Sequence, residues 1–403
     1  MADLLFLAHR IPYPPNKGDK IRSWNILKFL AQHYRIHLGC FIDDPQDERH
    51  RATLEELCAS CRFATLHPQH ARFRSLGGLL SGAPLTLPYF WSKELAGWAD
   101  SLLRERAIGH VFAFSSSMAQ YVLGDAARPA RRVIDYVDVD SDKWRQYAAA
   151  KSWPANWIYG RESRALLAFE RKVAREADAC LFVSEAEAEL FRRVAPEAAA
   201  KTFALNNGVD YDFFDPAINH QRPFDGDGEN LVFTGAMDYW ANVDAVSWFA
   251  HEILPSIRAR RPSVRFWIVG AKPASQVIAL KSIDGVRVTG SVPDVRPYIL
   301  NADVVVAPLR LARGVQNKVL EAMAMGRPVI ASPEALEGIQ AEIDNEVVCA
   351  AGEREFVERT LSLLDDAWAE AIGRRARQRV IGGYGWASNL SVLKTLLENG
   401  RLS

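Results

Sequence analysis

The sequence has 403 residues, of which 49% are hydrophobic and 24% are charged, and the basic and acidic residues both number 49. This length and composition favour a soluble protein of two domains, and the zero net charge gives no general attraction to nucleic acid. No apolar run approaches the ~20 residues that span a bilayer. The first residues, MADLLFLAHR, lack the pattern of a secretory signal and are expected to form a strand.

The five cysteines are an odd number, which favours a reducing cytoplasm over a disulfide framework. Cys58 and Cys61 form a single C-x-x-C with no second pair and no predicted strand before it. We therefore expect two surface thiols on one helix in preference to a redox or zinc site.

Short apolar runs alternate with amphipathic helical stretches along the whole chain. In the first half, the predicted strands are 4–9, 35–41, 63–67, 110–115, 132–137, 179–184 and 201–207, and the predicted helices include 19–33, 92–106 and 157–176. In the second half, the predicted strands are 230–235, 264–270, 286–290, 303–309 and 327–332, and the predicted helices are 242–260, 316–325 and 353–365. Apolar strands joined by helical crossovers predict parallel sheets that are covered on both faces.

A turn-rich stretch at 206–230, heavy in Asn, Asp, Gly and Pro, marks the predicted domain boundary. The sequence thus predicts an α/β fold of two doubly wound, Rossmann-like domains, 1–205 and 206–385, whose parallel sheets face an interdomain cleft. Residues 386–403 are expected to form a C-terminal helix that packs back toward the first domain.

The stretch RGVQNKVLEAMAMGRPVIA (313–331) has the order loop, short helix and strand. Its helix is predicted to begin near Gln316 or Asn317, where free backbone N–H groups can bind a phosphate. Lys318 can add a positive charge, and the Glu321 carboxylate can accept hydrogen bonds from the two hydroxyls of a ribose. The alternative is an exposed Lys318–Glu321 pair with a small structural role. Another glycine, Gly235, ends a second strand of this domain.

Several motifs in this half resemble the retaining family-4 glycosyltransferases of the GT-B fold. They are NNGVDYDFFDP, GSVPDVRPYILNADVVVAPL and GVQNKVLEAMAMGRPVIAS. HRIPYPPNKGDKIRSWNIL and VIDYVDVDSDKW more narrowly resemble the sugar transferases of PEP-CTERM/exosortase exopolysaccharide systems. The similarity extends over nearly the whole chain.

The resemblance implies an acceptor-binding first domain and a nucleotide-sugar-binding second domain. Glu321 matches the second Glu of the family's E-x7-E motif, and Gly18 matches a glycine loop that approaches the diphosphate. The other donor-side positions are Gly235, Val292, Pro293, Arg310, Arg313, Gly314, Val315, Gln316, Asn317 and Lys318. Lys318 is also expected to support catalysis, and the resemblance implies neither a metal nor another cofactor.

The sequence departs from the family pattern in three places. The first Glu of E-x7-E is replaced by Arg313, and Met237 and Asn242 stand where a basic pair is usual. No histidine is evident at the strand ends FAFSSSM and DYVDVD of the first domain. Either the donor differs, or the chain is a non-catalytic partner that binds a nucleotide sugar or glycan. A Rossmann oxidoreductase is disfavoured because no G-x-G-x-x-G follows a predicted strand.

In the first domain, DYVDVDSDKW places Asp138 and Asp140 after a predicted strand. We expect Asp138 to act on an acceptor hydroxyl, with Asp140 beside it; capping of the next helix is the alternative. A D-x-D metal site belongs to a single-domain fold and is not expected here. The four aromatic residues that follow either stack on sugar rings and line an acceptor groove or fix the loop to the core; they are Trp144, Trp153, Trp157 and Tyr159.

Glu162 and Glu170 of the first domain are expected to be solvent-exposed charges. The basic and apolar stretch 70–91 either rests on an anionic membrane surface, which would suit a lipid-linked acceptor, or packs as an ordinary loop. The predicted protein is thus a cytoplasmic transferase that acts on a polysaccharide precursor, with a peripheral contact at the inner membrane.

Overall fold

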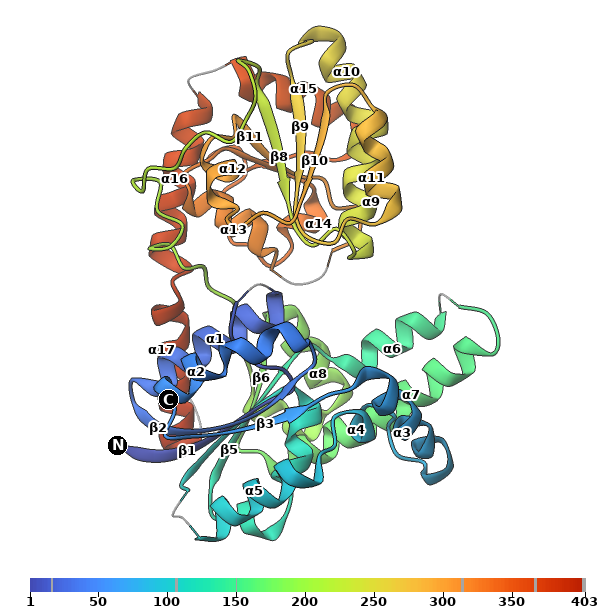
Figure 1. Cartoon of the computed structure of the whole chain (residues 1–403), viewed down its shortest axis with the longest axis vertical. Helices are drawn as coiled ribbons and strands as arrows, with labels where there is room; N and C mark the ends of the chain where they lie inside the picture. Colours follow the sequence, from blue (N-terminus) through green and yellow to red (C-terminus); the bar gives the residue numbers. More distant parts are fainter. Residues whose placement is uncertain (16, 106–107, 150, 313–314, 366–367, 401–403) are drawn as a thin grey trace. The chain divides into compact units, whose positions relative to one another are not determined.

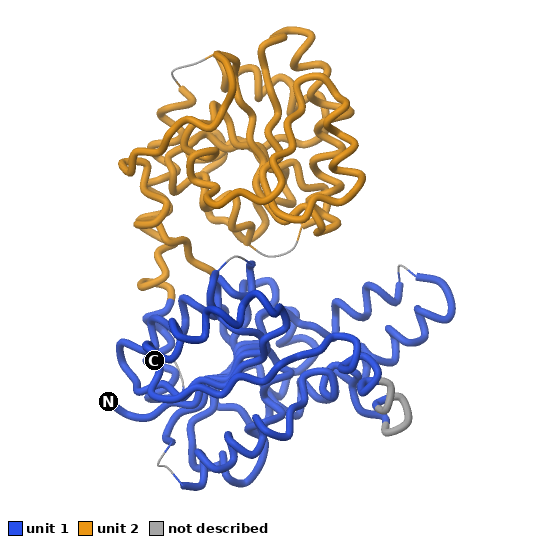
Figure 2. The backbone as a smooth tube through the Cα atoms, viewed as in Figure 1, with its two compact units in different colours: residues 1–206, 390–403 blue, residues 207–389 orange. Residues whose placement is uncertain are grey.

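The computed structural model describes residues 1–15, 17–105, 108–149, 151–312, 315–365 and 368–400. The chain forms two compact units (Figures 1 and 2). Unit 1 comprises Met1–Asn206 and the chain from Leu390 onward, and unit 2 comprises Asn207–Asn389. The second crossing between the units falls inside the last helix, α17 (Trp386–Asn399).

Unit 1 contains one parallel sheet, which has seven strands among the described residues, in the order β3-β2-β1-β4-β5-β6-β7. The strands are β1 (Ala2–Ala8), β2 (Tyr34–Ile42), β3 (Ser60–Thr65), β4 (His110–Phe114), β5 (Arg131–Val137), β6 (Ala179–Phe182) and β7 (Thr202–Ala204). The α-helices are α1 (Gly18–Ala31), α2 (Arg51–Leu57), α3 (Pro68–Ser81), α4 (Thr86–Tyr89), α5 (Lys93–Glu105), α6 (Asp140–Ala149), α7 (Ala155–Glu176) and α8 (Glu185–Val194).

Unit 2 repeats this plan with a parallel sheet in the order β10-β9-β8-β11-β12-β13, counted over the described residues. Its strands are β8 (Asn230–Thr234), β9 (Arg265–Val269), β10 (Val286–Gly290), β11 (Val304–Ala307), β12 (Val329–Ala331) and β13 (Val348–Cys349). Its helices are α9 (Trp240–Trp248), α10 (Leu254–Arg260), α11 (Ser275–Ala279), α12 (Arg296–Leu300), α13 (Asn317–Ala324), α14 (Pro333–Leu336), α15 (Gly352–Asp365) and α16 (Trp368–Gly383).

Both sheets are parallel because their strands are apolar on both faces and are joined by helices (Figure 1). Every residue of β8 and β11 is buried. The prediction of two doubly wound parallel-sheet domains is therefore confirmed. In each unit the chain starts in the middle of the sheet, runs outward to one edge, and returns to the other side. The switch points lie between β1 and β4 in unit 1 and between β8 and β11 in unit 2.

Two local predictions were wrong. The helix expected at 242–260 is interrupted by a π-helical turn at Phe249–Ile253, just before Pro255, because proline has no N–H to donate and its ring clashes with the preceding turn. Cys58 and Cys61 do not share a helix: Cys58 is buried at the end of α2, and Cys61 lies in β3. Among the described residues, no helix combines the length and apolarity that a membrane span requires.

Candidate donor site at the switch point of unit 2

Two glycines bring the ends of β8 and β9 into direct contact. The Gly235 N–H donates to the Val269 carbonyl at 3.0 Å, and a methyl group at Gly270 would overlap the Gly235 carbonyl oxygen. A Cβ at Gly235 would lie 2.7 Å from Asn242 Nδ2 and 3.5 Å from Lys318 Nζ. Only glycine fits both positions, so the backbone itself forms the floor of this strand end.

Lys318 connects the two sides of the switch point. It belongs to the first turn of α13, which follows β11, and its Nζ donates a hydrogen bond of 2.5 Å to Asn242 Oδ1 on α9, which follows β8. The ammonium also lies 4.4 Å from the centre of the Phe233 ring. The carboxyl ends of β8 and β11 are thus joined by one cation, at the position where open α/β sheets bind ligands.

Glu321 lies one turn further along α13, and both it and Lys318 are partly buried. Burial lowers the pKa of Lys318 to about 7, although Glu321 opposes this shift. Burial likewise raises the pKa of Glu321 to about 7, with Lys318 opposing. The alternative of an exposed surface pair does not describe these side chains, because neither of them is exposed.

Two polar atoms at this strand end and helix start are buried without a hydrogen-bond partner in the described part of the chain. They are Asn317 Oδ1 at the start of α13 and Thr234 Oγ1 at the end of β8. Buried polar atoms are nearly always paired in folded proteins. Together with the positive dipole end at the start of α13, they equip this edge of the sheet to receive a polar ligand.

The other predicted donor residues are more dispersed. Arg310 is half-exposed, and its Nε donates to Asp244 on α9 at 3.0 Å. Val315 is buried beside α13. Val292 and Pro293 follow β10, which is the edge strand two places away from β8. Gln316 directly precedes α13. The predictions for Arg313 and Gly314 fall outside the described residues.

Unit 1 has a histidine at its own switch point that the sequence analysis missed. His9 directly follows β1, and its ring stacks on Phe114 at the end of β4 with 5.6 Å between ring centres. Its Nε2 lies 3.3 Å from Asp19 Oδ2, while its Nδ1 is buried with no partner among the described residues. The signal was present in the motif LAHR, but His9 was counted as part of the first strand.

Gly18 is the first residue of α1, next to Asp19. No heavy atom of the described chain lies within 4 Å of where its Cβ would be, so nothing in the fold itself requires a glycine here. The role of Gly18 in a glycine loop that approaches the diphosphate stays a prediction.

Asp138 and Asp140 lie together just beyond β5, as expected. Both accept hydrogen bonds from Lys143, at 2.7 Å and 3.2 Å. Val137, the last residue of β5, has φ of 70°, which is a rare conformation for a β-branched residue and carries strain of about 1–3 kcal/mol. Such strain is concentrated at functional sites, so it marks this strand end as a candidate acceptor side.

The aromatic and acidic residues of α6 and α7 have structural contacts. Trp144 on α6 packs on Tyr159 on α7 with 5.2 Å between ring centres, which joins the two helices. The prediction that Glu162 and Glu170 are solvent-exposed was wrong. Glu162 accepts from the Leu85 and Thr86 N–H groups, and Glu170 accepts from Ser141, because each carboxylate faces inward against a helix start.

Comparison with known proteins places this geometry in a class. Residues 228–366 match the family model described as glycosyl transferases group 1, while a search of curated proteins finds no match. The matched region contains the whole switch point of unit 2. Unit 2 is thus similar to glycosyl transferases group 1, and the two-domain fold of the whole chain is that of the GT-B glycosyltransferases.

Solved structures share the fold of the whole chain. Sucrose-phosphate synthase from Thermosynechococcus elongatus has a TM-score of 0.68 at 17% identity and covers 99% of this chain and 98% of its own. Anabaena HepE in complex with UDP and glucose has a TM-score of 0.68 at 16% identity, with coverages of 99% and 100%. A glycosyltransferase from Rickettsia africae has a TM-score of 0.66 at 11% identity, with coverages of 99% and 98%. Identities this low show the fold alone.

Proposed function

We propose that the protein transfers a sugar from a nucleoside diphosphate sugar to a polysaccharide precursor with retention of anomeric configuration. Unit 2 binds the donor and unit 1 binds the acceptor, at the cytoplasmic face of the membrane. The single observation that carries the proposal is the Lys318–Asn242 hydrogen bond across the switch point, with Glu321 one turn away. This arrangement places a cation that can bind a diphosphate one helical turn from a carboxylate that can bind a ribose.

The donor assignment follows from the chemistry of α13. The diphosphate is held by Lys318 and the N–H groups at the start of the helix, and Glu321 accepts hydrogen bonds from the ribose hydroxyls. The same cation and dipoles stabilise the charge that develops on the departing diphosphate, so no metal or other cofactor is proposed. Anabaena HepE, which has this fold, was solved in complex with UDP-glucose, which favours a UDP-linked donor.

The acceptor assignment rests on the strand ends of unit 1. We place the acceptor hydroxyl near Asp138 and Asp140, which follow the strained end of β5. Asp138 is the proposed catalytic group on this side, and Trp144 and Tyr159, which pack on each other across α6 and α7, are the proposed aromatic lining. The PEP-CTERM-like motifs support a glycan of an exopolysaccharide system, carried on a lipid, as the acceptor.

Replacing Glu321 with alanine tests the donor site directly. Loss of the carboxylate removes the hydrogen bonds that the ribose hydroxyls donate to it. The Kd for UDP-glucose is therefore expected to rise at least about tenfold. Isothermal titration measures this, and Glu337→Ala, which removes an exposed carboxylate of the same unit, serves as the control. Unchanged affinity in Glu321→Ala would show that the ribose lies elsewhere.

The affinity for UDP-glucose is also expected to depend on pH, with a maximum near pH 7. Above about 7, free Lys318 loses its proton, so binding must recharge it and weakens as pH rises. Below about 7, free Glu321 is protonated and cannot accept from both hydroxyls, so binding weakens as pH falls.

Two variants separate the limbs of this profile, again by titration calorimetry. Lys318→Arg keeps its charge at all these pH values and should flatten only the alkaline limb. Glu321→Gln should flatten only the acid limb. A wild-type affinity that stays constant from pH 6 to pH 8 would contradict the proposed roles of both groups.

A further inference from the structure

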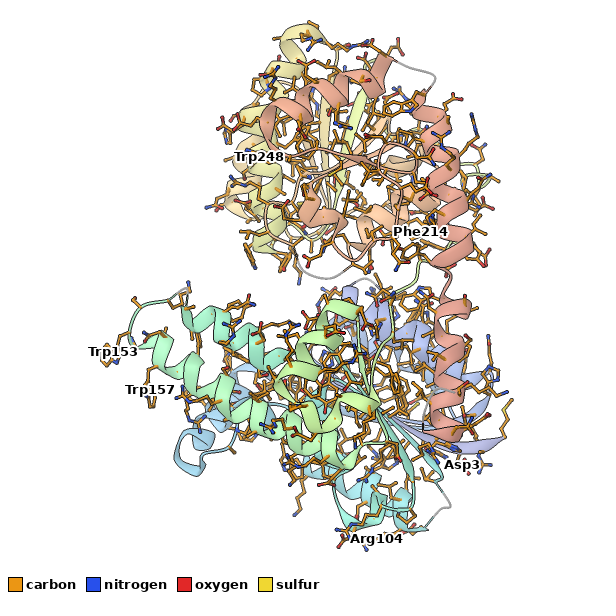
Figure 3. All side chains as sticks on the ribbon, turned by 180° about the vertical axis from the view of Figure 1, so that it is seen from behind. Asp3, Arg104, Trp153, Trp157, Phe214 and Trp248 are labelled. Atoms are coloured by element: carbon orange, nitrogen blue, oxygen red, sulfur yellow. The ribbon has the colours of Figure 1, made fainter. Side chains whose placement is uncertain are left out.

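The tip of the α6–α7 hairpin carries large, exposed aromatic side chains. Trp153 is 79% exposed and Trp157 is 59% exposed, and Tyr147 on α6 is also exposed. Figure 3 shows Trp153 and Trp157 at the far end of the hairpin, pointing away from the rest of unit 1. Single exposed apolar residues are common, but two exposed tryptophans at the end of one projection are not.

The neighbouring helix α3 extends this surface. Its Phe73 is 73% exposed, and Arg72 and Arg74 flank it in exposed positions. Arg161 on α7 donates to the Gly78 carbonyl at 2.5 Å and to the Ala83 carbonyl at 3.0 Å, so the end of α3 is attached to the hairpin. The two elements therefore present their aromatic residues from one part of unit 1.

The charged residues of the α3 segment and of the hairpin tip are all basic. From residue 57 to residue 93, and again from residue 143 to residue 161, the sequence contains Lys and Arg but neither Asp nor Glu. Lys143 and Arg145, at the base of the hairpin, are paired with aspartates that precede this segment. At the tip, Lys151 is exposed and, like Arg72, has no ion-pair partner among the described residues.

The tip is held in place by buried groups. Glu162 accepts hydrogen bonds from Leu85 N and Thr86 N at 2.7 and 3.0 Å, and Glu170 accepts from Ser141 N at 3.1 Å and from its hydroxyl. These contacts fix α7 to α4 and α6 behind the tip. The helices that carry the aromatic residues of the tip are therefore held in place by buried hydrogen bonds.

We propose that the hairpin tip and α3 form a docking surface for an anionic lipid bilayer. Tryptophan favours the boundary between headgroups and acyl chains, and cations beside it are attracted to anionic headgroups. A glycan would fit less well, because these two segments contain no carboxylate to accept hydrogen bonds from sugar hydroxyls. The zero net charge of the whole chain means that any attraction must come from a local surface such as this one.

Sedimentation of the full-length protein with vesicles tests the proposal without a donor or an acceptor, so its outcome is independent of the proposed transfer reaction. Wild-type protein should bind vesicles that contain phosphatidylglycerol and phosphatidylcholine, and binding should weaken as salt increases. Trp153→Ser with Trp157→Ser should weaken binding at least about tenfold, since two large apolar groups no longer enter the interface. Lys151→Glu should weaken it by about fivefold or more.

Matched controls come from unit 2, where Trp240 and Lys281 are also exposed. Trp240→Ser and Lys281→Glu should bind vesicles as wild type does. Thermal unfolding of the hairpin variants should match that of wild type, because the replaced side chains are in solvent. The proposal would be overturned if wild-type protein did not sediment with anionic vesicles. Hairpin variants that bind vesicles normally but transfer poorly to a soluble glycan would also overturn it, in favour of an acceptor groove.

Discussion

Replacing Lys318 with methionine is expected to lower the rate of sugar transfer by about 10²–10³-fold. Methionine keeps an unbranched apolar stem over the Phe233 ring but removes the ammonium that bridges to Asn242. The lost group is the cation proposed to stabilise the departing diphosphate, and the charge of that diphosphate grows in the transition state. The effect should therefore fall mainly on kcat.

Initial rates at saturating UDP-glucose, with a glycan acceptor, measure this effect. Lys281→Met, which removes an exposed ammonium from the same unit, should have wild-type rates. A thermal unfolding curve close to that of wild type would show that Lys318→Met is folded. Transfer by Lys318→Met within a factor of three of wild type would exclude Lys318 from the reaction and would move the proposed diphosphate site.

Replacing Arg22 with alanine is expected to destabilise unit 1 by about 3–5 kcal/mol. Arg22 and Asp135 are both fully buried, with Nε–Oδ2 and Nη2–Oδ1 distances of 2.8 and 3.2 Å, and Arg22 also donates to the Leu205 carbonyl. Burial raises the pKa of Asp135, and Arg22 counteracts this shift. Without the guanidinium, a carboxylate at the centre of the sheet has no cation beside it.

Urea unfolding followed by circular dichroism measures this loss as a lower midpoint. Arg104, visible at the edge of unit 1 in Figure 3, provides the comparison, because its pair with Asp100 at 2.7 Å is exposed. Arg104→Ala should change stability by less than about 1 kcal/mol. The double variant Arg22→Ala with Asp135→Asn should recover part of the stability, because its buried side chain at position 135 carries no charge that needs a cation. Equal midpoints for Arg22→Ala and Arg104→Ala would show that the buried pair does not support the fold.

Much of the fold could be predicted from the sequence because the main signal is local. The buried strands are continuous apolar runs, and amphipathic helices join them, so both parallel sheets were expected from pattern alone. β13 was missed because its two residues are too short for any periodicity. The π-turn before Pro255 was missed because the apolar spacing continues across it, and the missing proline N–H affects only the backbone.

The candidate site was only partly predictable. The positions of Lys318 and Glu321 on a short helix and of Gly235 after a strand could be predicted, because a helix start and a strand end can be recognised in sequence. Asn242 was noted only as a replacement for a basic residue, because its contact with Lys318 joins positions 76 residues apart. The inward-facing Glu162 and Glu170 were misjudged for the same reason, whereas His9 was missed because it was assigned to the first strand. Whether a polar side chain faces solvent or a neighbouring helix is decided by tertiary packing, which periodicity does not encode.

The burial of Lys318 has a consequence for turnover. An amine that is only about half charged at neutral pH gains part of a proton when a doubly anionic diphosphate binds beside it, and Glu321 loses a matching part when it accepts from the ribose. When the nucleoside diphosphate leaves, both groups return to their former protonation. In the proposed reaction, the binding and release of the nucleoside diphosphate are thus coupled to a reversible protonation of Lys318. A permanently charged residue at this position would release the product more slowly.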